Sequence, residues 1–97
     1  MKNVTEKQKE RLAEMFKAMG ETSRLVILDI LHEQPRCVTE IAEITKLSQS
    51  LASHHLRILR TSDVVKQTKQ GRKVIYSLYD DHVSQIFELS VEHASHM

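Results

Sequence analysis

The feature that most restricts the fold of this chain is a pair of short helical segments with only a few residues between them. Residues 38–45 carry their apolar side chains on one side of a helix. Residues 46–47 interrupt this pattern, and Ser48 is a good N-cap for a second helix over residues 49–61. Two helices joined by such a tight turn form a helix-turn-helix, which we predict over residues 38–61.

The second helix of this pair has two chemically different faces. Ala52, Leu56 and Leu59 give it a core face, and small polar and basic side chains crowd another face. A helix of this kind fits the major groove of DNA, where Ser and Gln reach base edges and Arg reaches phosphates. The DNA-binding candidates on it are Ser48, Gln49, Ser50, Ser53, His54 and Arg57. The alternative is that these side chains only coat an exposed helix start.

A β-hairpin is predicted directly after the helix-turn-helix. Residues 64–68 and 73–78 are rich in β-branched side chains and flank Lys69-Gln70-Gly71-Arg72, where Gly71 tolerates a positive φ. A hairpin with a basic tip in this position is a wing, which would place Arg72 in a minor groove and its lysine neighbours near phosphates. A solvated hairpin tip is the alternative. The DNA-binding candidates here are Gln70, Arg72 and Lys73.

Two further helices precede the predicted helix-turn-helix. Apolar residues at helical spacing predict an amphipathic helix over residues 6–19, which Gly20 ends. The next helix along the chain is capped by Thr22 or Ser23 and runs to Glu33. Its LVILDIL run is typical of a buried central helix. The fold class is therefore mainly α with a small β-hairpin, a winged helix-turn-helix.

The last segment, residues 80–96, repeats apolar side chains at helical spacing although little chain is left to pack against them. A terminal helix of this kind is often a dimer contact. We therefore expect a homodimer whose contacts come from the helices over residues 6–19 and 80–96. A chain of 97 residues has room for one domain with a modest core, so a partner would add burial.

Composition narrows the class of protein. Hydrophobic residues make up 40%, with two Gly and one Pro, which favours an ordered helical chain. No apolar run is long enough for a membrane span, and the polar start MKNVTEKQKER predicts no signal peptide. With a single cysteine no internal disulfide forms, and we expect a cytoplasmic protein.

Charge is distributed unevenly although the net charge is only +1. Residues 57–73 hold six basic side chains and one acid, whereas residues 74–97 hold four acids and no Lys or Arg. A basic stretch is an electrostatic footprint for phosphate, and it is as often a solvated surface.

The acidic tail carries four potential metal ligands, Asp80, His82, His93 and His96. At about 100° per residue the three histidines share one stripe, but His82 and His93 lie about 16 Å apart along the helix axis. One helix therefore does not bring them to one ion. Two antiparallel copies do: Asp80 and His82 of one subunit meet His93 and His96 of the other, giving two equivalent sites per dimer.

Such a site offers one oxygen and three nitrogen ligands. This set suits Zn(II) or Co(II) in tetrahedral geometry, with Ni(II) at higher coordination. The alternative needs no metal, because His near a helix C-terminus is favoured by the helix dipole and Asp80 is a good cap by itself.

These motifs together resemble a known family. The matching segments are FKAMGETSRLVILDIL, LSQSLASHHLRILR, VVKQTKQGRKVIYSL and the terminal pattern D-x-H-x(10)-H-x(2)-H. The chain resembles the ArsR/SmtB family of metal-sensing repressors, most closely the CzrA-type zinc and cobalt sensors with the metal site on the C-terminal helix. The resemblance implies a dimer that binds a palindromic operator upstream of metal-resistance or efflux genes and dissociates on binding metal. It implies DNA contacts by Gln49, Ser50, Ser53 and His54, and by the wing at residues 70–72.

One departure from the family concerns cysteine. Some members bind soft metals through a Cys-x-Cys pair where this chain has Cys37-Val38-Thr39. We therefore expect Cys37 to be a half-buried residue and not a ligand or a redox switch. We expect His32 to be a surface or capping residue, His54 to belong to the DNA face, and His55 to face the core edge.

Two other functions remain as alternatives. The first is a winged-helix DNA-binding regulator of the same fold that senses a non-metal or redox signal. The second is a metal-dependent enzyme, which needs an open coordination position and a substrate cleft. A site filled by four protein ligands on so short a chain argues against an enzyme.

Overall fold

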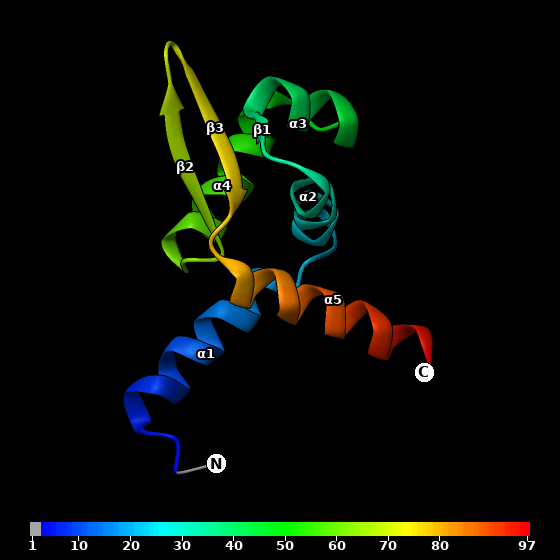
Figure 1. The fold of residues 1–97 in the computed structure, drawn as a ribbon. Coiled ribbons are helices and arrows are strands. Elements are labelled where there is room, and N and C mark those ends of the chain that lie inside the picture. Colours follow the sequence, from blue (N-terminus) through cyan, green and yellow to red (C-terminus); the bar gives the residue numbers. More distant parts are fainter. Residues whose placement is uncertain (1–2) are drawn as a thin grey trace.

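The structure is a computed structural model that describes residues 3–97. It is mainly helical with one small antiparallel sheet, as predicted, and the strands lie in the order β1-β3-β2. Figure 1 shows α2, α3, α4 and the β2–β3 hairpin gathered into one body, from which α1 and α5 extend. The elements are α1 (Glu6–Met19), α2 (Thr22–Glu33), β1 (Arg36–Cys37), α3 (Val38–Thr45), α4 (Gln49–Thr61), β2 (Val65–Gln70), β3 (Lys73–Leu78) and α5 (Asp81–Ser95).

Helix α1 has the predicted bounds. A capping box starts it, in which the Gln8 amide donates to the Thr5 hydroxyl and the Gln8 side chain accepts from the Thr5 amide. Gly20 ends it without a left-handed turn, at φ −84°, and its amide donates to the Phe16 carbonyl at 2.9 Å. A Cβ on Gly20 would lie 3.0 Å from that carbonyl oxygen, so a larger residue is crowded here.

Helix α2 corrects two expectations. Its N-cap is Glu21, whose carboxylate accepts from the Arg24 amide at 2.9 Å, whereas Thr22 and Ser23 lie inside the first turn. The Glu21 side chain bonds the amide of the third helical residue, as the shorter side chain of a Ser or Thr N-cap does. N-cap propensity alone does not predict a glutamate in this position. The helix is also less buried than predicted, because Leu25 and Val26 are exposed.

The helix-turn-helix is formed by α3 and α4, with the bounds expected from the sequence. Lys46 adopts a left-handed conformation, φ 65°, which allows the sharp turn between them. Ser48 caps α4, and its hydroxyl accepts from the Leu51 amide at 3.0 Å. The inner sides of both helices enter the core, which includes Ile41, Ala42, Ala52, Leu56 and Leu59.

The hairpin follows α4, but its turn is shorter than predicted. Gln70 pairs with Lys73, so only Gly71 and Arg72 form the turn, and Gly71 has φ 61°. Strand β2 continues beyond residue 68, where it was predicted to end, because Lys69 pairs with Val74 across the hairpin. Cross-strand hydrogen bonds determine the end of a strand more than the strand propensity of its residues does.

A third strand was not predicted. The two-residue strand β1 pairs with β3, placing Arg36 opposite Tyr76. So short a segment has no periodicity to read, and only the position of β3 makes it a strand.

Helix α5 begins after the cap residue Asp80 and diverges from α1, as Figure 1 shows. Val83 and Phe87 are buried against the body, whereas Leu89 and Val91 farther along are exposed. On α1 the apolar Leu12 and Phe16 are exposed as well. Within residues 3–97, no helix has the length and apolar character needed to cross a bilayer.

Candidate nucleic-acid interface and metal-ligand positions

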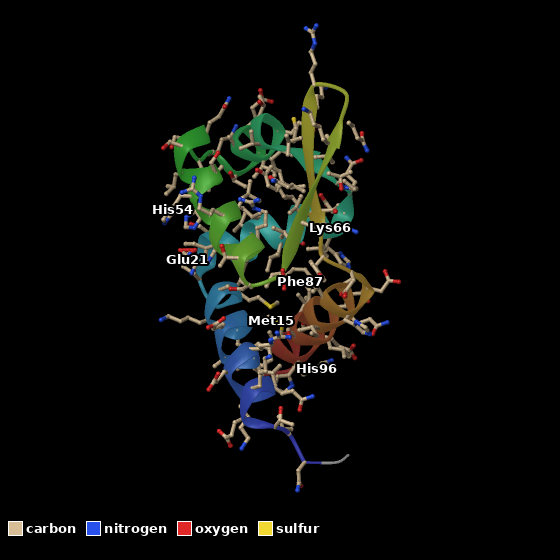
Figure 2. All side chains as sticks on the ribbon, turned by 90° about the vertical axis from the view of Figure 1, so that its left-hand side faces the viewer. Met15, Glu21, His54, Lys66, Phe87 and His96 are labelled. Carbon is tan, nitrogen blue, oxygen red and sulfur yellow. The ribbon has the colours of Figure 1, made fainter. Side chains whose placement is uncertain are left out.

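Helix α4 presents its predicted DNA-binding residues to solvent. Gln49, Ser50, Ser53, His54 and Arg57 are all exposed, and Figure 2 shows His54 directed outward from the body. Ser48 is exposed too, but its hydroxyl already caps the helix. An outer face of polar side chains, on a helix whose inner side is buried in the core, suits contact with base edges and phosphates.

The two adjacent histidines of α4 point to different environments, as predicted. His54 is exposed, whereas His55 is buried, with 8% of its surface accessible. The Nδ1 atom of His55 lies 3.3 Å from a guanidinium nitrogen of Arg24 on α2. Sequence reasoning did not single out Arg24, because the contact joins residues far apart along the chain.

The hairpin projects from the body (Figure 1), and both of its strands contain lysine. The predicted contacts Gln70, Arg72 and Lys73 are exposed, as are Lys66 and Lys69 on β2. A Cβ added to Gly71 would meet no atom within 4 Å, so φ, and not space, is what favours glycine at the tip.

The first pair of predicted metal ligands lies at the start of α5. One Asp80 oxygen accepts from the Val83 amide at 3.1 Å, and the other lies 3.5 Å from Nδ1 of His82. These contacts lower the pKa of Asp80, with the Val83 hydrogen bond as the largest cause and His82 adding to it. The side chains of Asp80 and His82 therefore already stand together, and the carboxylate is held in its charged form.

The second pair lies at the far end of the same helix. His93 is in its last turn and His96 is its C-cap residue, and both are exposed. Within residues 3–97, no group of three or more His, Cys, Asp or Glu side chains stands close enough to hold one metal ion. The structure of one chain thus brings Asp80 to His82 but does not bring either of them to His93 or His96.

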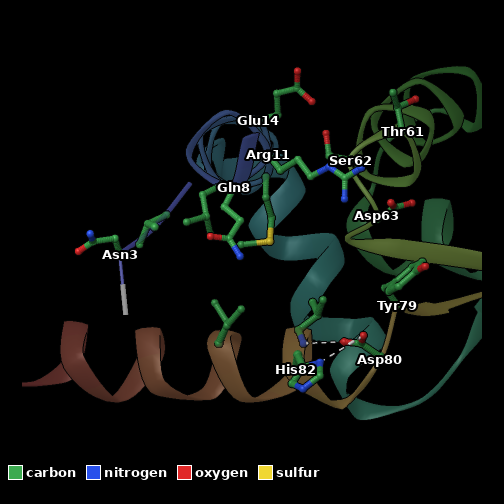
Figure 3. Close-up of a pocket in the computed structure, with 15 residues that line it drawn as sticks. Asn3, Gln8, Arg11, Glu14, Thr61, Ser62, Asp63, Tyr79, Asp80 and His82 are labelled. Atoms are coloured by element: carbon green, nitrogen blue, oxygen red, sulfur yellow. Dashed lines mark hydrogen bonds and ion pairs between the residues drawn. The ribbon is translucent and has the colours of Figure 1, made fainter. Parts of the chain in front are cut away.

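A groove of about 830 Å³ lies between α1, the end of α4 and the start of α5 (Figure 3). Asp80 and His82 line it on one side. Ser62 and Asp63 line it at the end of α4, which is the candidate recognition helix of the helix-turn-helix. Asp63 has a left-handed backbone, φ 56°, which turns the chain out of α4 toward β2. Sequence reasoning did not find this groove, since it is made by segments distant in the chain.

Two other residues singled out in the sequence have structural contacts. Cys37 is half-buried, and its amide donates to the Glu40 carboxylate at 3.0 Å. His32 does more than occupy the surface: its Nε2 lies 2.8 Å from a carboxylate oxygen of Glu88 on α5, and its ring packs on Phe87 at 5.5 Å.

Comparison with known proteins identifies the family. Residues 21–67 match the model of the bacterial regulatory proteins of the arsR family. The regulator NmtR of Mycobacterium tuberculosis is 39% identical over 87 residues, which cover 90% of this chain and 72% of that protein. The chain belongs to the ArsR/SmtB family. Its members are DNA-binding transcriptional regulators.

Other relatives of this ArsR/SmtB chain agree. An SmtB homolog of Synechocystis sp., described as a transcriptional repressor, is 41% identical over 86 residues, 89% of this chain. The chain spans only 65% of the length of that protein. A CadC homolog of Staphylococcus aureus, described as a cadmium resistance regulatory protein, is 37% identical across 95% of this chain and 77% of its own length.

Solved structures give the same fold. The homodimeric winged helix-turn-helix DNA-binding domain of a possible ArsR-family regulator from Mycobacterium bovis superposes with a TM-score of 0.85 at 27% identity, covering 100% of this chain and 96% of that one. A solution structure of apo-NmtR gives 0.79 at 35% identity, covering 100% and 82%. The winged helix-turn-helix of this ArsR/SmtB chain is therefore confirmed. The family match stops at residue 67, before Asp80 and the three histidines of the proposed metal site.

Proposed function

We propose that this ArsR/SmtB protein is a homodimeric repressor that binds operator DNA and releases it on binding a transition-metal ion, with Zn(II) as the first choice and Co(II) or Ni(II) as alternatives. The observation that carries the proposal is the arrangement of ligands on α5. Asp80 and His82 stand together at one end, and His93 and His96 lie at the other.

Dimerisation is supported by the apolar surfaces left uncovered on the two extended helices. Leu12 and Phe16 on α1, and Leu89 and Val91 on α5, are exposed. In two antiparallel copies of α5, Asp80 and His82 of one subunit would meet His93 and His96 of the partner subunit. The dimer would then hold two equivalent sites.

The donor chemistry fits a borderline metal. A bound Zn(II) ion would link carboxylate and imidazole donors of two subunits, for which one oxygen and three nitrogens are a suitable set. The hydrogen bond from Val83 keeps Asp80 ionised, as a ligand must be. Cys37, the only thiol, is in β1 and lies outside this set, which favours zinc over thiolate-seeking metals.

Regulation requires that DNA-competent and incompetent dimers differ in metal affinity. We propose that the second ring N–H of His93 reaches the backbone near Ser62 and Asp63, where α4 ends. The shared groove supports this route, because Ser62 and Asp63 line it together with the Asp80–His82 half-site (Figure 3). Replacing His93 by a ligand that lacks the second N–H should keep metal affinity and abolish regulation. Regulation that survives this change contradicts the route.

A regulator of the same fold that responds to another signal is the second candidate. It is favoured by one observation: Asp80 already has a full structural role as the α5 cap, without any metal. The two candidates differ in whether metal changes the affinity for DNA.

The test is a fluorescence-anisotropy titration of a duplex taken from upstream of this protein's gene, with and without one zinc per subunit. Salt is held fixed, since phosphate contacts make affinity steeply salt-dependent. We expect zinc to weaken binding by about tenfold or more, within the usual range of allosteric coupling. The double variant His93→Ala, His96→Ala should not respond. His32→Gln, which removes a histidine outside the site but keeps an amide N–H that can donate to Glu88, should respond normally. Equal binding with and without zinc refutes the metal sensor and leaves the second candidate.

A further inference from the structure

The recognition helix contains a buried polar contact that the proposed function does not use. His55 is the one polar or charged residue that is buried among residues 3–97. It follows His54 directly but lies on the inner side of α4, so it has no access to DNA. A polar side chain buried in a small apolar core is costly unless a partner satisfies it.

The partner is Arg24, which connects three helices. From the first turn of α2, its Nη1 atom contacts Nδ1 of His55 on α4 at 3.3 Å. Its Nε atom donates to the carbonyl of Ala18, near the end of α1, at 2.6 Å. That carbonyl is among the last four of α1, which lack partners inside their own helix. One guanidinium therefore holds the end of α1 and the middle of α4 at a fixed separation.

The contact specifies the protonation state of His55. A guanidinium only donates hydrogen bonds, so Nδ1 must accept and the proton must sit on Nε2 of a neutral ring. A protonated ring would lose the acceptor and would place a second positive charge beside Arg24. The ionisable groups around the ring are Glu21, Arg24 and His54, of which only Glu21 favours protonation of His55. Burial, the largest cause, lowers the pKa of His55 from its usual 6.5.

We infer that the Arg24–His55 contact is a positioning contact for DNA reading, which sets the recognition helix against the dimerisation helix α1. This inference rests on the proposed function. A dimer reads two half-sites about 34 Å apart, so each recognition helix must be held at a defined place relative to the dimer axis. Arg24 and His55 are positioning residues, since neither faces the DNA.

Two substitutions of His55 separate its acceptor from its bulk. His55→Asn places an amide oxygen where Nδ1 stands, and His and Asn have similar helix propensity. His55→Leu keeps a side chain of similar size but makes it apolar and removes the acceptor. We expect His55→Leu to bind the operator duplex about tenfold more weakly, a loss comparable to one mismatched base pair, because its recognition helix is no longer held in place for the half-site. It should bind unrelated DNA as the wild type does. His55→Asn should stay within about threefold of the wild type for both duplexes.

The pH profile of operator binding provides a readout that a purely structural role would not move. As the pH falls below about 6.5, in chelator and at fixed salt, the wild type should lose operator affinity that His55→Asn keeps, because the amide acceptor of asparagine does not titrate. His32→Gln, which removes a histidine outside the contact, should keep the acid loss of the wild type.

Each outcome decides the inference. Operator affinity of a folded, dimeric His55→Leu equal to that of the wild type overturns it. If His55→Leu fails to fold, the comparison between the wild type and His55→Asn decides. An identical loss of operator affinity at acid pH in these two proteins overturns the inference. Wild-type protein that binds no operator duplex refutes the proposed function instead. In that case an NMR titration of the His55 ring still tests the contact. Arg24→Gln should raise the pKa of His55, because Arg24 lowers it, and an unchanged pKa of His55 contradicts the contact itself.

Discussion

Two residues with left-handed backbones delimit the recognition helix. Lys46 precedes α4 with φ 65°, and Asp63 follows it with φ 56°. Residues with a Cβ adopt this conformation at a cost, so the surrounding structure must hold them there. At the end of α4 it does so by hydrogen bonds from the Asp63 amide to the Arg60 carbonyl at 3.1 Å and from the Val64 amide to the Leu59 carbonyl at 2.9 Å.

The strain at Lys46 predicts an ordering of two variants. Lys46→Gly should be more stable than Lys46→Ala by about 1 kcal/mol, because glycine adopts positive φ without a steric penalty. Urea unfolding followed by circular dichroism measures both free energies of unfolding. Equal stability would show that the turn relaxes to another conformation when the lysine is replaced.

Side chains on α4 should divide into those that read bases and those that hold phosphates. Gln49→Ala should lower operator affinity by about 1–3 kcal/mol and relax the preference for one base pair. Arg57→Ala should weaken all duplexes alike and reduce the salt slope by about one phosphate contact. Titrations of single-base variants of the operator at several salt concentrations measure both effects. A change of sequence preference in Arg57→Ala would contradict this division.

At the scale of elements, the start of α5 combines a helix cap with a proposed metal ligand. Asp80→Asn should keep the cap, since Asn is as good an N-cap as Asp, but remove the anionic oxygen. We therefore expect normal helix content and a zinc affinity lower by at least about tenfold, the loss that even outer partners of metal ligands produce. Circular dichroism and competition with a chromophoric chelator measure the two properties. Asp80→Ala is the comparison that should lose both.

A second contact of α5 predicts a pH dependence. Glu88 accepts from His32 at 2.8 Å and from Ser84 at 3.2 Å, and the hydrogen bond from His32 is the largest cause of its lowered pKa. The folded state thus binds this proton less readily than the unfolded state, whose Glu88 titrates near 4.5. The stabilisation is complete above that pH and is lost as the pH falls through the folded pKa.

Glu88→Gln should therefore remove part of the acid sensitivity of α5. Hydrogen exchange of the α5 amides between about pH 3 and about pH 7 measures this, with intrinsic rates corrected at each pH. Glu92→Gln, which changes an exposed acid on the same helix, is the control. Equal acid sensitivity in the wild type and Glu88→Gln would show that the contact with His32 does not hold the helix.

The sequence predicts the long elements well and the contacts between them poorly. Helices α1, α3 and α4 have their predicted bounds, because apolar periodicity and local caps act within a few residues. Strand β1 exists only through pairing with β3, and the short turn at Gly71 reflects cross-strand bonds. The pairing of Asp80 with His82 is local and readable. The groove that joins them to Ser62, and the contact of Arg24 with His55, depend on tertiary packing and leave no pattern in the sequence.

At the scale of the whole molecule, α1 and α5 leave apolar side chains without cover. We expect Phe16→Glu and Leu89→Asp to shift the protein from dimer to monomer, because Phe16 is 55% and Leu89 is 65% exposed in one chain. Sedimentation velocity measures the oligomeric state. Leu25→Asp is the matched control, since Leu25 is 42% exposed but lies on α2, outside the proposed interface. A dimer that survives both substitutions would place the interface elsewhere.

The uncovered faces of α1 and α5 also tie this chain's behaviour to its abundance. A fold that gains burial from its partner should melt at a higher temperature when the protein is more concentrated. Below the dissociation constant of the dimer, the amount of assembled regulator rises with the square of the chain concentration. A modest fall in synthesis would then release a regulated gene more than proportionally, so expression level would act as a second input beside the effector.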